Sequence, residues 1–204
     1  MARFLPSSKW PAMIKNRSLT LFPGKCGLVL LCLWLFIPGM TFGQAPYCDP
    51  VYQNGCSQGD NLRDVFLSSF AQSGSGCSTN QYKLNTSDTI DVQRGITYSL
   101  TVASGGGQKD GIGAWIDYAK NNNFSNFGEF IGSVNPPGGT QQTIIFTVPI
   151  TARLGNTRLR IRTQRSSNGI PSAGQSCDTF TFGEAEDFIL NIQLAPSCNA
   201  PTNL

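Results

Sequence analysis

The chain has 204 residues, of which 40% are hydrophobic and 13% charged, and it contains no histidine. Its length suits one domain of ordinary size, and its apolar content excludes a chain that is disordered throughout. The missing histidine excludes a Ser-His-Asp triad, a Cys-His pair, a His-ligated metal and an imidazole pH switch.

Residues 1–43 have the composition of a secretory signal peptide. They carry five basic side chains and no acidic one, and an apolar run extends from Gly27 to Ile37. This run is shorter than the ~20 residues of a membrane span, and an uncleaved N-terminal anchor is the alternative. Cleavage before Gln44 leaves 10 basic and 12 acidic residues, a net charge of −2 in place of +3. We therefore expect neither a nucleic-acid partner nor a transmembrane segment after signal cleavage.

Residues 44–195 show the period-two alternation of apolar side chains that is typical of β-strands. The alternating segments are 96–102, 112–118, 144–148, 158–162 and 188–194. Residues 63–70 fit either a strand or a short helical turn. No helical pattern of about 10–15 residues lies between the segments, which argues against a parallel sheet with helical crossovers. The sequence predicts an all-β domain over 44–195, an antiparallel β-sandwich or jelly roll.

Four motifs follow one another in this part of the chain. They are Tyr47-Cys48, the segment from Trp115-Ile116-Asp117-Tyr118 to Glu129, Gly155-Asn156-Thr157-Arg158-Leu159-Arg160, and Gly183-Glu184-Ala185-Glu186-Asp187-Phe188. Their order and spacing resemble the GEVED domain family, whose pattern is YC, WIDWNxDGxFxDxxE, GxTRLRV and, after a cysteine, GEVEDY. The resemblance covers about residues 46–194. It implies a non-catalytic β-sandwich accessory module of large secreted or cell-surface bacterial proteins, some of them peptidases and some adhesin-like, with no agreed ligand.

The last residues, 196–204, have a linker-like composition. The segment from Cys198 to Leu204 is similar to the start of a fibronectin type III module, and such modules often follow GEVED domains. We therefore expect other domains of the same polypeptide as partners. The family resemblance also implies that the protein is secreted or held at the outer cell surface.

Five cysteines remain after residue 43, and none belongs to a CxxC motif of the zinc-binding or redox type. They are Cys48, Cys56, Cys77, Cys177 and Cys198. We assign Cys198 to the following module, where its partner stays open, and the other four then allow three disulfide connectivities. The first and last strands of a sandwich commonly lie side by side, and shorter GEVED family members resemble this chain in the two outer cysteines while lacking the middle pair. The prediction is therefore Cys48–Cys177 and Cys56–Cys77.

The segment from Asp117 to Glu129 resembles an oxygen-rich loop of the family that suggests calcium. The candidate ligands are Asp117, Asn121, Asn123 and Glu129. The pattern is eroded, because Ala119 and Ser125 replace polar or acidic residues and neutral amides bind calcium more weakly than carboxylates. The alternative is a loop closed by side-chain hydrogen bonds to its own backbone, with Asn122 taking the positive φ of a glycine. We expect weak or absent calcium binding and no other cofactor.

Three carboxylates lie within four residues, and three arginines alternate along one predicted strand, so that they share a face. These residues are Glu184, Glu186 and Asp187, and Arg158, Arg160 and Arg162. We expect arginine–carboxylate pairs between the two segments, with unpaired arginines in solvent. Binding of a hard cation and a pair of acids for glycoside hydrolysis are the alternatives.

Trp115, Tyr118 and Phe124 are candidates for an aromatic platform that stacks on a sugar. The alternative is that these rings belong to the core, because a buried tryptophan removes ~150–250 Å² from water.

The predicted function is a non-catalytic adhesion or targeting module of a larger secreted or cell-surface protein. The alternative is a carbohydrate-binding module attached to a secreted hydrolase or peptidase, with a polysaccharide or cell-surface ligand as partner. We do not expect an enzyme, because the chain has neither a histidine nor a GxSxG motif.

Overall fold

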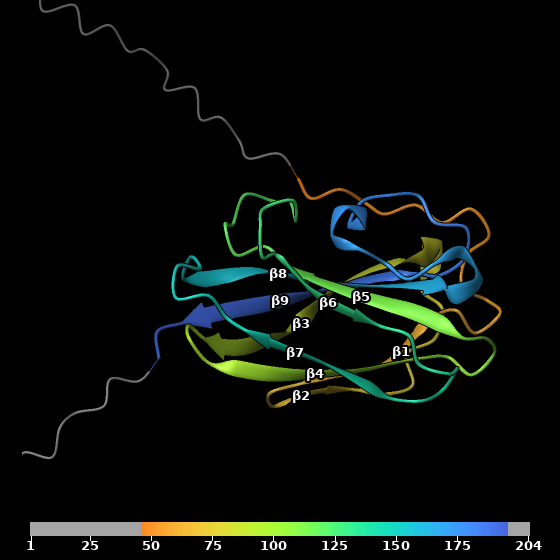
Figure 1. Cartoon of the computed structure of the whole chain (residues 1–204), viewed down its shortest axis with the longest axis horizontal. Coiled ribbons are helices and arrows are strands. Elements are labelled where there is room, and N and C mark those ends of the chain that lie inside the picture. Colours follow the sequence, from red (N-terminus) through yellow and green to blue (C-terminus); the bar gives the residue numbers. More distant parts are fainter. Residues whose placement is uncertain (1–45, 196–204) are drawn as a thin grey trace, which may run out of the picture. The chain divides into compact units, whose positions relative to one another are not determined.

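The computed structural model describes residues 46–195, which form two β-sheets packed face to face (Figure 1). The four-stranded sheet has the order β2 (Phe70–Gln72), β1 (Leu62–Leu67), β4 (Thr97–Ser104), β7 (Gln142–Thr147). The five-stranded sheet has the order β3 (Tyr82–Gln93), β9 (Ala185–Gln193), β8 (Gly155–Arg165), β5 (Asp110–Ile116), β6 (Phe130–Val134). The predicted all-β sandwich is confirmed. The predicted signal peptide, the predicted linker and module start at 196–204, and Cys198 lie outside the described residues.

The helices within this range are three short 3₁₀ turns: Thr79–Gln81, Ser166–Asn168 and Ala173–Gln175. Across the described part of the chain, none of the helices has the length and apolar character needed to cross a membrane.

One strand pair departs from the predicted antiparallel arrangement. β9 runs parallel to β3, in a register that begins at Tyr82 opposite Ala185 and ends at Gln93 opposite Gln193. The other strand pairs among the described residues are antiparallel. Alternation within a strand shows which side chains are buried but not which distant strand becomes its neighbour, so this one parallel pair within the predicted sandwich was not foreseen.

The hydrophobic core fills the space between the sheets. Both sheets contribute fully buried side chains, among them Leu62, Val65, Leu100, Val102, Ile112, Ile161, Phe188 and Leu190. Because successive side chains on a strand point to opposite faces, the intervening residues of β5, β8 and β9 lie on the outer face of the five-stranded sheet.

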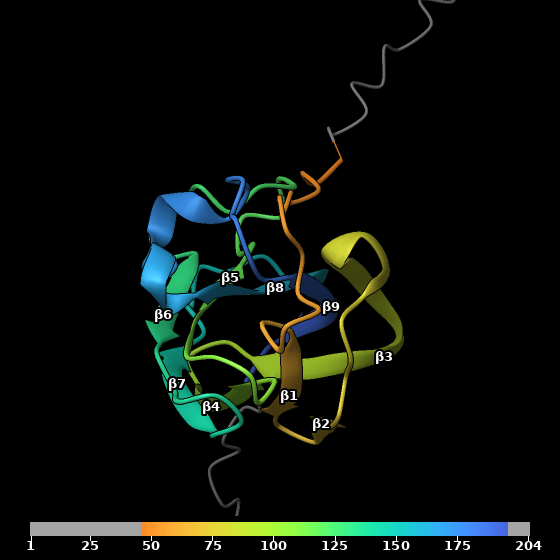
Figure 2. The same cartoon turned by 90° about the vertical axis from the view of Figure 1, so that its right-hand side faces the viewer.

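A third layer covers that outer face (Figure 2). It consists of residues 46–56 and 166–183, which pair with each other through a bridge between Tyr52 and Phe180. Backbone hydrogen bonds extend this pairing, including Asn54 N to Thr181 O at 2.8 Å and Gly183 N to Gly55 O at 3.0 Å. The result is that Trp115, Arg160, Arg162 and Asp187 are fully buried although they lie outside the sandwich.

Two disulfides link this layer covalently. One joins Cys48 to Cys177 and the other joins Cys56 to Cys77. This is the pairing that we expected from the sequence.

Candidate functional site

The loop of residues 117–129, which connects β5 to β6, carries all four predicted metal ligands. Its first residue, Asp117, accepts hydrogen bonds from the backbone N–H groups of Asn121 (3.2 Å) and Asn122 (2.9 Å) and from the hydroxyl of Tyr47 (2.6 Å). Asn122 has a φ of 62°, the left-handed conformation that the sequence suggested for an asparagine in the place of a glycine. Both carboxylate oxygens of Asp117 therefore serve to shape the loop.

The last residue of the 117–129 loop has the same role. Glu129 accepts hydrogen bonds from the backbone N–H of Ala119 (3.0 Å) and from the backbone N–H of Asn126 (3.0 Å). Burial raises the pKa of Glu129, and these two N–H donors oppose that shift.

The two asparagine candidates likewise bond within the loop. The side-chain oxygen of Asn121 accepts the N–H of Asn123, and that of Asn123 accepts the N–H of Ser125. The 117–129 loop thus has the hydrogen-bond pattern of the second interpretation, in which the side chains close the backbone. A calcium ion would have to replace several of these bonds, and weak or absent binding stays our prediction for this loop.

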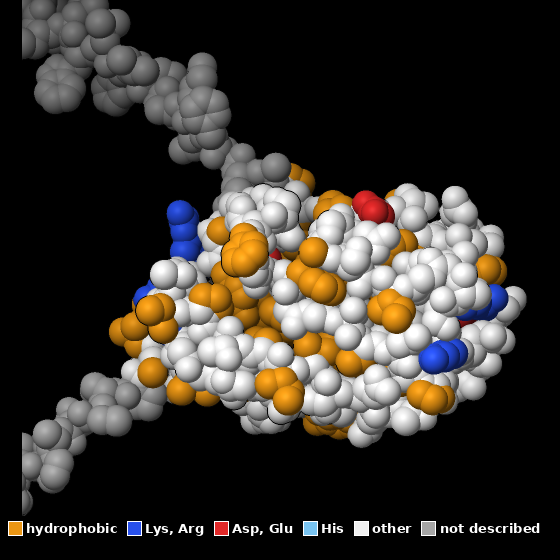
Figure 3. All heavy atoms as spheres, in the orientation of Figure 1, with side chains coloured by type: hydrophobic (Ala, Val, Ile, Leu, Met, Phe, Trp, Pro, Cys, Tyr) orange, Lys and Arg blue, Asp and Glu red, His pale blue; other side chains and the backbone are white. Residues whose placement is uncertain are grey.

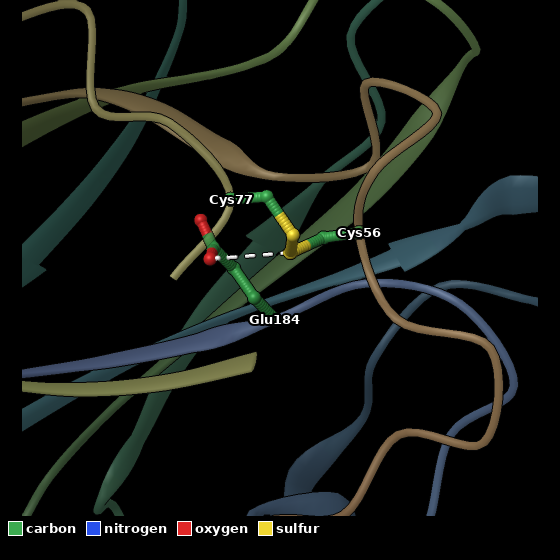
Figure 4. Close-up of side chains that lie close together, drawn as sticks. All are labelled: Cys56, Cys77 and Glu184. Carbon is green, nitrogen blue, oxygen red and sulfur yellow. Dashed lines mark hydrogen bonds between the residues drawn. A yellow bond between two sulfur atoms is a disulfide. The ribbon is translucent and has the colours of Figure 1, made fainter. Parts of the chain in front are cut away.

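Within residues 46–195, one group of three Cys, Asp or Glu side chains brings its potential ligand atoms within 4.8 Å of one another: Cys56, Cys77 and Glu184 (Figure 4). The two sulfur atoms are bonded to each other. Because a disulfide offers no thiolate, this group does not form a metal-binding set. The 3.4 Å approach of Glu184 Oε2 to Cys56 Sγ is a contact without a proton, since the oxidised sulfur has none to donate.

The three aromatic side chains proposed as a sugar platform are buried. Their relative exposures are 0% for Trp115, 7% for Tyr118 and 2% for Phe124. They therefore offer no open ring face, and the structure contradicts the platform hypothesis for these residues. Trp115 also lies outside the core between the sheets, because it occupies the outer face of β5. There its Nε1 donates a hydrogen bond to Ala173 O at 2.9 Å, beneath the covering layer.

The exposed aromatic side chain of this region is Phe127, whose relative exposure is 108%. It lies near the end of the 117–129 loop, between Asn126 and Gly128, and these three residues line two hollows. One, of about 630 Å³, extends along Phe124, Phe130 and residues 173–174. The other, of about 460 Å³, extends along Tyr118, Glu129, Pro149 and residues 151–153. Figure 3 shows hydrophobic side chains gathered around a hollow on this face.

The loop that presents Phe127 is anchored by the start of the domain. Tyr47 donates its hydroxyl hydrogen bond to Asp117 and packs its ring against Phe124, with centroids 5.3 Å apart. The guanidinium of Arg158 lies over the Tyr47 ring, 4.0 Å from its centroid. From the sequence, Tyr47 was part of a motif only, and neither its role as an anchor nor the exposure of Phe127 was predicted.

The alternating arginines do share one face, as predicted, but they are not solvated. Arg160 and Arg162 are fully buried beneath the covering layer. Arg160 pairs with Asp187, and Arg158 contacts the same carboxylate at 3.2 Å. Arg162 has no carboxylate partner of this kind; it donates to the Tyr52 hydroxyl and to the carbonyls of Gln175 and Asp178.

The two glutamates of the acidic segment point to the opposite face. Glu184 accepts the backbone N–H groups of Leu62 (2.7 Å) and Ser78 (2.8 Å). Glu186 accepts side-chain hydrogen bonds, including one from Ser75 Oγ at 2.9 Å. The predicted arginine–carboxylate pairing between the two segments is therefore present, and Asp187 is the acid that makes it. Residues 184 and 186 alternate with 187 along the chain, so the two glutamates face away from the arginine row.

The fold and this loop together define a disulfide-linked β-sandwich that presents an exposed aromatic residue on a hydrogen-bonded loop. Residues 111–191 match the family model of the GEVED domain. This range takes in most of β5, the 117–129 loop, β8 and most of β9. The GEVED domain is an accessory domain, and the match fits a non-catalytic role. A search of the curated proteins finds no match.

Proposed function

We propose that this chain is a non-catalytic adhesion or targeting module of a larger secreted or cell-surface protein, and that Phe127 is its ligand-contact residue. The observation that carries this proposal is the full exposure of the Phe127 ring between two hollows. A ligand that covers this ring removes apolar surface from water, and this burial contributes favourable free energy to binding. The hydrogen bonds of Asp117 and Glu129 fix the loop beforehand, which lowers the entropic cost of binding.

The chemistry of the buried acids supports a non-catalytic role. Glu184, Glu186 and Asp187 are fully buried and hydrogen-bonded to the fold. Their carboxylates are directed to two different faces, away from the hollows around Phe127. A pair of acids for glycoside hydrolysis needs both carboxyl groups to face one substrate bond, which this arrangement does not offer.

A location outside the cell is part of the proposal. The two disulfides are typical of oxidising compartments, and the described residues contain no helix suited to crossing a membrane. Other domains of the same polypeptide are the proposed covalent partners.

Carbohydrate binding is the second candidate function, and the surroundings of Phe127 favour it. An exposed ring stacks on the C–H face of a sugar, while Asn126 and the exposed Arg153 border the same hollow and can donate hydrogen bonds to hydroxyl groups. If the module has this second function, its ligand is a polysaccharide.

The test compares the purified chain with Phe127→Ala on a glycan array and in binding to cells. The control is Ile145→Ala, which removes another exposed apolar side chain from β7 in the other sheet. We expect Phe127→Ala to weaken binding at least tenfold without changing the thermal melting temperature, and Ile145→Ala to bind normally. If Phe127→Ala bound the ligand as tightly as the unchanged chain, Phe127 would not be a ligand-contact residue. Binding to cells without binding to any glycan would retain the adhesion module and reject the carbohydrate ligand.

A further inference from the structure

A second cluster of polar side chains lies at the end of the sandwich where four strands begin or end. Asp60 precedes β1, Ser104 ends β4, Asp110 begins β5 and Arg165 ends β8. Strand pairing brings them together, because Asp110 lies opposite Arg165 and Ser104 lies opposite Leu62. None of these residues belongs to the 117–129 loop or contributes to the site around Phe127.

Asp60, Ser104 and Asp110 are all fully buried, with relative exposures of 0%. Asp60 has a partner, since Arg165 donates to its two carboxylate oxygens at 2.9 and 2.6 Å. Asp110 lies beside both Asp60 and Ser104. However, neither carboxylate oxygen of Asp110 has a hydrogen-bond partner, and the hydroxyl oxygen of Ser104 has none either.

A buried Asp110 carboxylate beside a second carboxylate lowers the stability of the fold. A buried carboxylate without a partner loses its hydration and gains nothing in return. Burial raises the pKa of Asp110 to about 7; the Ser104 hydroxyl opposes this shift and the neighbouring Asp60 carboxylate adds to it. A positive ion between the two carboxylates would compensate both the burial and the repulsion.

We propose that Asp60, Ser104 and Asp110 form a calcium-binding site. The donor set is made of two carboxylates and one hydroxyl, which are hard oxygen ligands of the kind that calcium prefers, and calcium tolerates irregular geometry and neutral or water ligands in the remaining positions. Magnesium is less suited, because it demands near-ideal octahedral geometry and gives up its water reluctantly.

The charges of the cluster set the expected affinity. Arg165 already neutralises one of the two carboxylates, so the site offers a single net negative charge to the ion. We therefore expect weak binding, with a dissociation constant on the order of 0.1–1 mM, as found for extracellular modules. The site is independent of the proposed ligand contact at Phe127, and either can fail without the other.

The experiment measures calcium binding by the purified, metal-free chain at pH 7.5, by isothermal titration and by thermal melting in EDTA and in about 10 mM calcium chloride. We expect one site and a rise of the melting temperature by about 3–10 °C in calcium. Asp110→Asn keeps the side-chain volume but removes the charge. It should abolish the calcium-dependent rise and, in EDTA, melt above the unchanged chain because it removes a buried charge without a partner.

Two further variants keep the test decisive. Ser104→Ala should weaken calcium binding several-fold even if Asp110→Asn fails to fold. The matched control Asp91→Asn, an exposed acid on β3, should leave binding unchanged. Asp117→Asn locates the ion, because loss of binding in this variant alone would place calcium in the 117–129 loop and overturn the proposal. No calcium-dependent heat or melting shift, or a full shift in Asp110→Asn, would also overturn it.

Discussion

Arg160 and Asp187 form a fully buried, two-pronged ion pair on the outer face of the five-stranded sheet. The guanidinium donates from Nε to Oδ1 and from Nη2 to Oδ2, each at 2.8 Å. Arg160 also donates to Cys48 O at 2.7 Å and to Ser176 O at 3.0 Å. One guanidinium therefore joins β8, β9 and both segments of the covering layer.

This geometry predicts a large effect for Asp187→Ala. The substitution leaves the Arg160 charge buried without its counter-charge, so we expect a loss of about 3–5 kcal/mol in the free energy of unfolding. Urea denaturation of the purified chain measures it. Asp91→Ala, which removes an exposed carboxylate hydrogen-bonded to Asn191, is the control and should cost less than about 1 kcal/mol. A similar loss in both variants would show that burial of the Arg160–Asp187 pair does not determine how much it contributes to the free energy of unfolding.

Gly183 begins the GEVED-like motif because no other residue fits there. Its φ is +133°, and an added Cβ would lie 2.1 Å from the carbonyl oxygen of Thr163. We expect Gly183→Ala to destabilise the domain by about 2–5 kcal/mol through backbone strain and this clash. Gly128→Ala is the matched control: its φ is +85° but its added Cβ meets nothing within 4 Å, so about 1 kcal/mol is expected. Equal effects in denaturant melts would exclude the clash as the cause.

Glu184 makes the stability of the fold depend on pH. Burial raises its pKa from 4.5 to about 7, although the N–H groups of Ser78 and Leu62 oppose the shift. The folded chain then binds this proton more tightly than the unfolded chain. The resulting stabilisation is present below about pH 4.5 and is lost as the pH rises through about 7. It amounts to about 3 kcal/mol at most.

The measurement is the free energy of unfolding between pH 4.5 and 8, compared with that of Glu184→Gln. We expect the variant to lose the part of this fall that is due to Glu184, while the part due to Asp110, whose pKa burial also raises to about 7, remains. Asp91→Asn, an exposed acid on β3, should keep the fall in full, whereas Glu186→Gln should reduce it, because the Glu186 charge adds to the shift. A pH profile that is unchanged in Glu184→Gln would assign the dependence to another group.

The two disulfides should contribute unequally. Their sequence separations are 129 residues for Cys48–Cys177 and 21 residues for Cys56–Cys77. In the chain-entropy model the first stabilises by about 5 kcal/mol and the second by about 3 kcal/mol. We expect the paired replacement of Cys48 and Cys177 by alanine to lower the denaturation midpoint more than the paired replacement of Cys56 and Cys77. The reverse order would show that native-state strain outweighs loop entropy.

The sequence predicted the strands that have one face in the core, since burial of one face imposes a period of two. It missed β2, β3 and β6, which lie at sheet edges, where a strand has fewer neighbours. In β3 only Ile90 and Val92 are buried, so most of its twelve residues show no alternation. The parallel pairing of β3 with β9 is set by packing between segments far apart in the chain, which no local pattern contains.

Prediction of the candidate site was limited in the same way. The positive φ of Asn122 follows from the chemistry of its own side chain and could be predicted. Whether an aromatic residue is exposed depends on what covers it. Trp115 and Phe124 are covered by segments distant in sequence, and Phe127 is not. The same covering layer, which carries little regular alternation, buries the arginines that were expected in solvent.

The Cys48–Cys177 bond also determines how the domain would carry mechanical force. A pull applied at residues 46 and 195 would pass from Cys48 through the disulfide to Cys177, and then only through residues 178–195. Residues 49–176 would lie outside the covalent path of the force while that bond is intact, and would be loaded only through their hydrogen bonds to residues 178–195. The loaded segment contains β9, which lies between β3 and β8 and would be pulled along its length, so that hydrogen bonds on both sides would resist in shear. An oxidised domain could therefore extend only by the length of its last strand and the residues leading to it, and would behave as a short link of nearly constant length.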